Sequence, residues 1–212
     1  MPDEFNTPYP SYNVLDKWRS PSWNAATRKV VQHRLEDVPE RRFFDEREWA
    51  LLLALCDRVI PQPDRAEPIP IAPFIDQALH EDRTQGTRYA VLPPEREAWR
   101  RGLAAFDAEA KARYGRSFTE ITDLERDHII RAIDKGETAT DAWGGMPAKP
   151  FLRNMVLKDI VSIYYAHPSA WSEIGFGGPA SPRGYLRLGM DRRDPWEARE
   201  ERHAHVRGVP KP

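Results

Sequence analysis

The stretch from Lys149 to Tyr185 reads KPFLRNMVLKDIVSIYYAHPSAWSEIGFGGPASPRGY and shows how the chain is organised. Apolar residues recur at helical spacing in its first half, which predicts a helix over about 150–167. Pro168 disfavours the helical conformation in the residue before it, so this helix is expected to end at His167. The second half is a loop that is poor in charge and carries aromatic residues among glycines and prolines.

Aromatic side chains in such a loop are expected to lie against something, either the core of the same chain or another protein. His167, beside the helix end, is interpreted first as a cap or a packed ring, with a catalytic base as the alternative. The Gly175-Phe176-Gly177-Gly178 run resembles a phosphate-binding loop only loosely. It lacks the GxGxxG spacing and the strand-then-helix context that such a site needs, so no phosphate site is predicted.

The rest of the chain predicts an all-α fold, with about five helices around one core and long proline-rich connections. No apolar alternation with a period of two residues is long enough for a sheet. Asp45 with Glu48, and Thr122 with Glu125, have the spacing of capping boxes at helix starts. The four helices expected before the last one cover about 45–60, 72–82, 94–114 and 123–135.

The two ends of the chain differ from this helical body. Residues 1–42 predict an extended arm, because prolines break helices there while tyrosines and tryptophans supply contact area; a short helix over about 24–35 is a further candidate. We expect residues 43–190 to form the helical domain and residues 191–212 to form a charged tail that is either a strap on the surface or disordered.

Composition excludes several classes of protein. A net charge of -1 with evenly mixed signs leaves no basic stripe for nucleic acid. Cys56 is the only cysteine, so no intrachain disulfide forms, and its apolar neighbours predict a buried thiol. No run approaches the roughly 18–20 apolar residues of a membrane-spanning helix, so no direct membrane insertion is expected. The first residues lack the apolar core of a secretory signal. Arg41-Arg42-Phe43-Phe44 is no twin-arginine signal, because charged residues follow it at once where an uncharged run is needed.

A search for catalytic motifs finds no GxSxG, HExxH, Walker loop or Rossmann fingerprint. His128 lies beside an apolar helix face, which is typical of a boundary histidine. His203 and His205 are two residues apart, too close in sequence to share one helix face, and no third ligand is near. No catalytic, cofactor-binding or metal-binding residue is therefore predicted in this chain.

Four segments together resemble the gluconate 2-dehydrogenase subunit 3 family over about residues 43–190. They are a leucine-rich helix with an Ile-Pro stop, a second short helix, a Ser-Phe step before a capped helix, and a Tyr-Tyr-x-His-Pro helix end followed by the glycine-rich aromatic loop. In sequence these are FFDEREWALLLALCDRVIPQPD, PIAPFIDQAL, Ser117-Phe118 before TDLERDHII, and MVLKDIVSIYYAHPSAWSEIGFGGPASPRGYLRLG.

The resemblance implies a non-catalytic accessory subunit that binds and stabilises the FAD-containing large subunit of a sugar or alcohol dehydrogenase. That large subunit is of the glucose-methanol-choline oxidoreductase type, and a cytochrome c subunit often takes its electrons. FAD is then expected in the partner and no cofactor in this chain. Many members carry a twin-arginine export signal, which this sequence lacks, so both a periplasmic and a cytoplasmic complex stay open.

We hypothesise that the arm at 1–42 and the loop at 167–188 together hold the large subunit, since aromatic residues and Arg are the usual interface anchors. Two other classes stay open. One is a stand-alone enzyme that uses His167, His128 and nearby carboxylates, and the other is an unrelated helical scaffold protein. The residues expected at the partner interface are Trp18, Trp23, His167, Trp171, Phe176, Arg183 and Tyr185.

Overall fold

The computed structural model describes residues 7–63, 65–83, 89–180, 184 and 193–201. Helices are the only regular secondary structure among these residues, so the predicted all-α class is confirmed. The chain divides into two compact units: unit 1 takes Met1–Asp37 and Tyr165–Pro212, and unit 2 takes Val38–Tyr164. These boundaries differ from the 43–190 domain of the sequence analysis, because the segment after the last long helix groups with the N-terminal residues.

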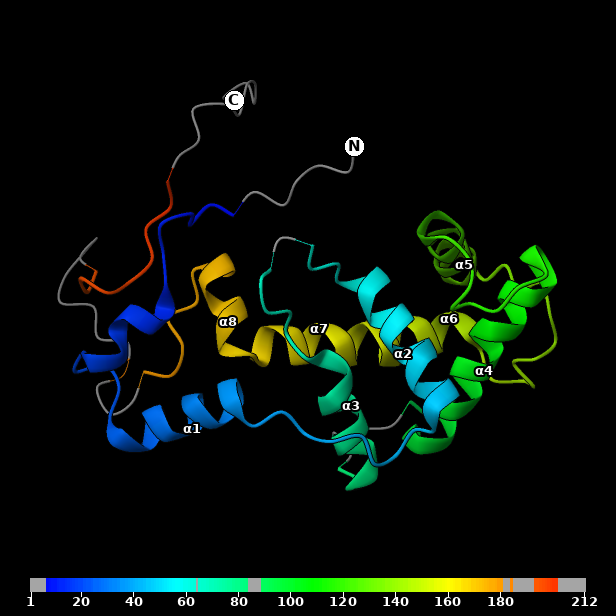
Figure 1. Cartoon of the computed structure of the whole chain (residues 1–212), viewed down its shortest axis with the longest axis horizontal. Helices are drawn as coiled ribbons and strands as arrows, with labels where there is room; N and C mark the ends of the chain where they lie inside the picture. Colours follow the sequence, from blue (N-terminus) through cyan, green and yellow to red (C-terminus); the bar gives the residue numbers. More distant parts are fainter. Residues whose placement is uncertain (1–6, 64, 84–88, 181–183, 185–192, 202–212) are drawn as a thin grey trace. The chain divides into compact units, whose positions relative to one another are not determined.

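Unit 2 holds α2 to α6 and most of α7 (Figure 1), and all the helices predicted for it are present with shifts of a few residues at their ends. In chain order they are α2 (Glu46–Val59), α3 (Ile71–His80), α4 (Glu95–Tyr114), α5 (Asp123–Lys135), α6 (Ala148–Phe151), the π-helical segment η2 (Leu152–Val156) and α7 (Leu157–Ala166), whose last two residues belong to unit 1.

The described part of the chain has more helical segments than the roughly five expected, for two reasons. The predicted helix over 150–167 is divided into α6, η2 and α7, because its middle turns adopt the wider π-helical bonding. The N-terminal helix α1 (Ala25–Glu36) forms as well, and short helices flank it in unit 1.

Local sequence signals set the helix ends as predicted. The Asp45 carboxylate accepts the Glu48 N–H at 2.8 Å, while the Asp45 N–H donates to the Glu48 carboxylate at 3.1 Å. Thr122 and Glu125 form the same reciprocal pair at the start of α5. Helix α5 ends at Gly136, whose φ of 84° is a left-handed conformation that favours glycine.

The core of unit 2 contains a continuous chain of aromatic rings, each pair in edge-to-face or tilted contact. Ring centroids lie 4.8 to 6.4 Å apart along it. Gly102 on α4 makes room for one of these rings, since a Cβ at this position would lie only 2.1 Å from Phe151. The order of rings is Phe43, Phe44, Trp99, Phe151, Trp143, Phe106 and Phe118.

Two buried carboxylates attach neighbouring segments to the helices of unit 2. Asp76 on α3 accepts the backbone N–H groups of residues 42–44 at 2.6 to 3.1 Å, which fixes the entry to α2. Asp107 on α4 accepts the Phe118 N–H at 3.0 Å and hydrogen bonds from Ser117, Arg47 and Lys111. Burial alone would raise the pKa of Asp107, but these bonds together lower it well below its usual value.

Glu109, also on α4, is fully buried and holds the connection between α5 and α6. Its carboxylate accepts the backbone N–H of Ala139 at 2.9 Å and the Trp143 indole N–H at 3.1 Å, and Arg113 donates to it from the next turn of α4. The buried acids Asp76, Asp107 and Glu109 are thus engaged by groups of the same chain.

Candidate functional site

The structure brings together the two segments that the sequence analysis assigned to partner binding. Unit 1 consists of η1 (Val14–Arg19) and α1 from the N-terminal side, with α8 (Pro168–Trp171) and η3 (Ser172–Ile174) from the other end of the chain. Its core is Val14, Trp23, Val31 and Trp171, with Tyr12, Leu15, Trp18 and Leu35 packed against it. Residues 7–37 are therefore more structured than the extended arm that was predicted.

Polar contacts join the same two segments. The Val14 N–H donates to the Ser172 hydroxyl at 3.1 Å, and the Thr7 hydroxyl donates to the Glu173 carbonyl at 2.6 Å. Residues 193–201 of the predicted charged tail also belong to this unit, since the Glu201 N–H donates to the Pro8 carbonyl at 2.9 Å. Unit 1 is thus built from residues that are far apart in sequence.

Glycines in the aromatic loop allow its backbone to approach rings closely. Gly178 has a φ of 67°, and a Cβ there would lie 2.8 Å from the Trp171 ring and 3.1 Å from the Trp23 ring. A Cβ at Gly175, with a φ of 65°, would lie 2.5 Å from the Tyr9 ring. The described part of the loop therefore closes over the tryptophans of its own unit, which is the physical reason for glycine in this run.

Two of the predicted interface residues are core residues of unit 1. Trp23 and Trp171 are each only 2% exposed, and the Trp171 indole N–H donates to the Tyr165 carbonyl at 2.8 Å. Side chains so enclosed cannot contact a partner in this conformation. Their position assigns them to the interior of unit 1, where they hold its two segments together.

The other predicted residues occupy different environments. His167 is buried and caps α8, with its Nδ1 accepting the Ser169 N–H at 3.3 Å, as the cap interpretation expects. Trp18 is half-buried, and its ring centroid lies 5.8 Å from that of Trp23 in an edge-to-face contact. Phe176 packs edge-on against Trp171 and keeps 42% of its surface exposed. Arg183 and Tyr185 lie outside the described residues.

Lys17 is a buried residue of unit 1 that the sequence analysis did not single out. Its ammonium group lies 5.4 Å from the centroid of the Trp23 ring and donates to the Gly177 carbonyl. Burial lowers the pKa of Lys17, and the carboxylates of Glu197 and Asp194 partly offset this. The neighbouring Trp18 marks an aromatic-rich stretch, but the ring that Lys17 contacts is that of Trp23, which the local sequence does not indicate.

Unit 2 has an open groove of about 600 Å³ between α2, the proline-rich connection and the start of α3. Apolar side chains line most of it, and Leu53 on α2 is 46% exposed there. We call it the proline groove, after Pro61, Pro63, Pro68, Pro70 and Pro73 in its lining. Sequence reasoning treated this stretch only as a connection, because pattern analysis finds helices and does not show which surfaces stay uncovered.

A smaller hollow of about 280 Å³ lies between α3 and α7 and contains Asp159. The Asp159 carboxylate accepts the Trp99 indole N–H at 3.1 Å. Burial raises the pKa of Asp159 to about 6, the bond from Trp99 opposes the rise, and the charge of Glu95 adds to it. Asp159 was not predicted, since a single acid in an apolar helix gives no signal of its surroundings.

The two histidines named for the stand-alone enzyme belong to different units. His128 is exposed on α5 of unit 2, where its Nδ1 lies 2.6 Å from the Tyr114 hydroxyl, whereas His167 is a helix cap in unit 1. Among the described residues, no group of three or more His, Cys, Asp and Glu side chains is arranged to hold a metal ion. His203 and His205 lie outside the described residues.

Two further expectations concern Cys56 and the membrane. Cys56 is buried on α2, as predicted, and burial followed by the charge of Asp57 raises the pKa of its thiol to about 12. Within the described ranges, no helix combines the length and the apolar character needed to cross a bilayer.

The described residues thus define an all-α protein with a helical unit that carries an open apolar groove and a small aromatic unit closed by a glycine-rich loop. The chain belongs to the family described as Gluconate 2-dehydrogenase subunit 3, whose model matches residues 46–178. A search of curated proteins and a search of solved structures found no match. The resemblance seen in the sequence is therefore confirmed.

Proposed function

We propose that this protein is a non-catalytic accessory subunit that binds and stabilises the FAD-containing large subunit of a gluconate 2-dehydrogenase-like sugar or alcohol dehydrogenase. The observation that carries the proposal is the family match over residues 46–178, since the family is named for a subunit of such an enzyme. FAD then resides in the large subunit, and a cytochrome c subunit accepts its electrons.

The environment of the acidic side chains supports a binding role. General acids and bases need a proton-transfer path to a substrate, whereas Asp76, Asp107 and Glu109 are engaged by backbone and side-chain groups of the same chain. The exposed large apolar side chains include Phe176 on unit 1 and Leu53 on unit 2, which are 42% and 46% exposed. Exposed apolar anchors of this kind favour contact with another protein.

The arrangement of unit 1 also supports a role for the N-terminal segment. The family match includes α8 and the loop up to Gly178, while residues 7–37, which complete the core of unit 1, precede it. We infer that unit 1 presents Trp18 and Phe176 to the large subunit, and that Trp23 and Trp171 give this surface its shape. Arg183 and Tyr185 stay part of the proposed interface.

Capture from the native host tests the proposal. The tagged full chain should retain a protein that releases FAD on denaturation and that oxidises a sugar or an alcohol. A variant lacking residues 1–37 should lose this protein, because unit 1 cannot form its core without Val14, Trp23 and Val31. A full chain that is captured without any flavoprotein, under conditions in which it is folded, would contradict the proposal.

A point substitution separates binding from folding. Phe176→Asp should weaken capture by roughly tenfold, which corresponds to the loss of one anchor of about 1.4 kcal/mol. Val30→Asp serves as the matched control, since Val30 is an exposed residue of α1 in the same unit. The control should bind the flavoprotein as the wild type does.

A further inference from the structure

Hydrogen bonds within the proline-rich connection brace one wall of the proline groove. The Gln62 side chain bridges the connection that forms one wall, because its Oε1 accepts the Ile69 N–H at 2.8 Å and its Nε2 donates to the Ile69 carbonyl at 3.2 Å. Prolines in the same wall have a fixed φ, so little conformational freedom is left to lose. A side chain that binds in the groove would therefore lose little binding free energy to ordering of this wall.

The floor and edge of the groove are apolar. Leu53 and Trp49 come from α2, Ile60 follows that helix, and Ile71 and Ala72 begin α3. Its volume of about 600 Å³ is within the range of sites that enclose a large side chain or a small ligand. Leu53 keeps nearly half of its surface exposed in a position where a neighbouring apolar group could cover it.

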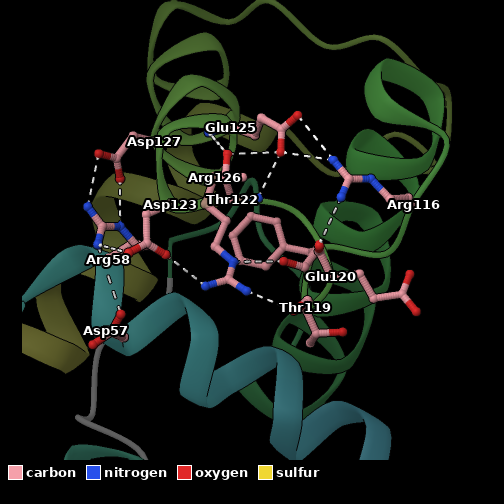
Figure 2. A network of polar contacts seen from close by, with 11 residues as sticks. Asp57, Arg58, Arg116, Thr119, Glu120, Thr122, Asp123, Glu125, Arg126 and Asp127 are labelled. Atoms are coloured by element: carbon pink, nitrogen blue, oxygen red, sulfur yellow. Dashed lines mark hydrogen bonds and ion pairs between the residues drawn. The ribbon is translucent and has the colours of Figure 1, made fainter.

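One part of the groove is charged, and the charged side chains most exposed to solvent there are carboxylates. Arg58 is enclosed by Asp57, Asp123 and Asp127, with its Nη1 3.0 Å from Asp123 and its Nε 2.9 Å from Asp127 (Figure 2). The Arg58 side chain is only 17% exposed, while those of Asp57 and Asp123 are 60% and 56% exposed. The three charged residues that line the groove thus present carboxylates outward and hide the guanidinium.

A second arginine reinforces this arrangement. Figure 2 shows Asp123 between Arg58 and Arg126, and the Arg126 Nη1 lies 3.0 Å from the Asp123 carboxylate. Arg126 is itself 16% exposed, because it also donates to the carbonyls of Phe118 and Thr119. The Asp123 carboxylate is therefore held between two arginines, and 56% of the Asp123 side chain stays exposed.

We propose that the proline groove binds the large dehydrogenase subunit, taking one aromatic or branched aliphatic side chain of that subunit beside a Lys or Arg that pairs with Asp57 and Asp123. This inference rests on the proposed function and specifies where unit 2 meets the partner. The occupant follows from chemistry: the apolar lining selects the inserted side chain, and the outward carboxylates select the basic residue next to it.

The test compares two glutamate substitutions at exposed apolar residues of helices in unit 2. Leu53→Glu places a carboxylate in the groove beside Asp57, and Val161→Glu on α7 is the control, with 46% and 40% exposure in the two wild-type residues. Leu53→Glu should lower the affinity for the purified flavoprotein subunit by at least about tenfold, while Val161→Glu should leave it unchanged. Thermal unfolding of both variants should resemble that of the wild type, since neither residue is in the core.

A separate substitution tests the charged part of the groove. Asp57→Asn should weaken binding a few-fold and should reduce the dependence of the affinity on salt, because one screened ion pair is lost. An affinity and a salt dependence equal to those of the wild type would remove the basic residue from the proposal.

The remaining outcomes separate the inference from the function. If the wild type binds the flavoprotein and Leu53→Glu binds equally well, the groove is not the contact and the proposed function stands. If the wild type does not bind the flavoprotein, both the inference and the proposed function are wrong. If Leu53→Glu instead converts a dimer of the isolated chain to a monomer and leaves flavoprotein binding intact, a second copy covers the groove. Equal losses in Leu53→Glu and Val161→Glu would also overturn the inference.

Discussion

Each of the two units is stabilised in a different way. Unit 2 is formed by one continuous stretch, and its helices pack around a chain of aromatic rings from Phe43 to Phe118. Unit 1 is formed by two stretches from opposite ends of the sequence, and its small core depends on Trp23 and Trp171. The comparison shows that the large unit can lose one contact and keep many others, whereas the small unit depends on a few long-range contacts.

Buried charge differs between the units in sign and in role. In unit 2 the buried charges are carboxylates, such as Asp76 and Glu109, which accept backbone N–H groups of connections. The buried charge described in unit 1 is the ammonium group of Lys17, which donates to the Gly177 carbonyl and lies over the Trp23 ring. In each unit the ion holds a loop, because a buried charge is stable only where hydrogen bonds replace its hydration.

The largest effect is expected from Trp171→Ala. Replacing a fully buried tryptophan by alanine typically costs about 3–5 kcal/mol, and the core of unit 1 has few residues that could close the cavity. We expect unit 1 to become sensitive to protease at residues 7–37 while unit 2 stays resistant. Limited proteolysis followed by mass spectrometry identifies the cleavage sites.

The same variant separates the structural role of Trp171 from the anchor role first hypothesised for it. Wild-type resistance of residues 7–37 combined with lost flavoprotein binding would mean that Trp171 contacts the partner directly. Phe151→Ala in the ring chain of unit 2 is the counterpart, and it should expose sites within 38–164.

Helices and their ends in unit 2 were predictable because their causes are local. The pairs Asp45–Glu48 and Thr122–Glu125 lie within one helical turn, and Gly136 ends α5 by its own left-handed conformation. The π-helical turns of η2 were not predictable, since the apolar spacing around them is compatible with an ordinary helix.

The association of the two chain ends was predicted only in part. Aromatic density correctly marked residues 7–37 and the loop after His167 as segments that pack against something. The hypothesis that both face a partner could not show that Trp23 and Trp171 pack in one core, because nothing local links residues so distant in sequence. The proline groove was not predicted for a similar reason. It depends on how distant segments pack around Leu53, and the local sequence does not show this.

An intermediate effect is expected from Asp159→Asn, because burial raises the pKa of Asp159, whereas hydrogen bonds lower the pKa of Asp107 in the same unit. Burial raises the folded-state pKa of Asp159 to about 6, above the ordinary value of 3.8, so the folded protein retains a proton that the unfolded chain releases. Its contribution to stability is therefore present at low pH and is lost as the pH rises from about 4 through 6.

Asparagine keeps an acceptor for the Trp99 indole N–H and has no charge to bury. The advantage of Asp159→Asn over the wild type in free energy of unfolding should be about 1.4 kcal/mol larger at pH 8 than at pH 5. Urea unfolding at the two pH values measures this difference. A gap between variant and wild type that is the same at both values would show that the charge of Asp159 is not the cause.

The smallest effect compares one helix cap from each unit. Asn24 accepts the Thr27 N–H at 2.8 Å at the start of α1 in unit 1, and Thr122 accepts the Glu125 N–H at 3.4 Å at the start of α5 in unit 2. Each substitution by alanine removes the cap's hydrogen bond to an N–H in the first turn of the helix and should cost about 1 kcal/mol. Amide hydrogen exchange resolves where that cost appears.

In Asn24→Ala the faster exchange should spread through α1 and the segments that pack on it, because unit 1 has little other structure to hold the helix. In Thr122→Ala it should stay within the first turn of α5, since the packing of Ile129 and Ile133 holds the rest of that helix. If the faster exchange spreads equally far in both variants, the two units respond alike to the loss of one cap. The units would then differ in how they are built but not in how they tolerate a local change.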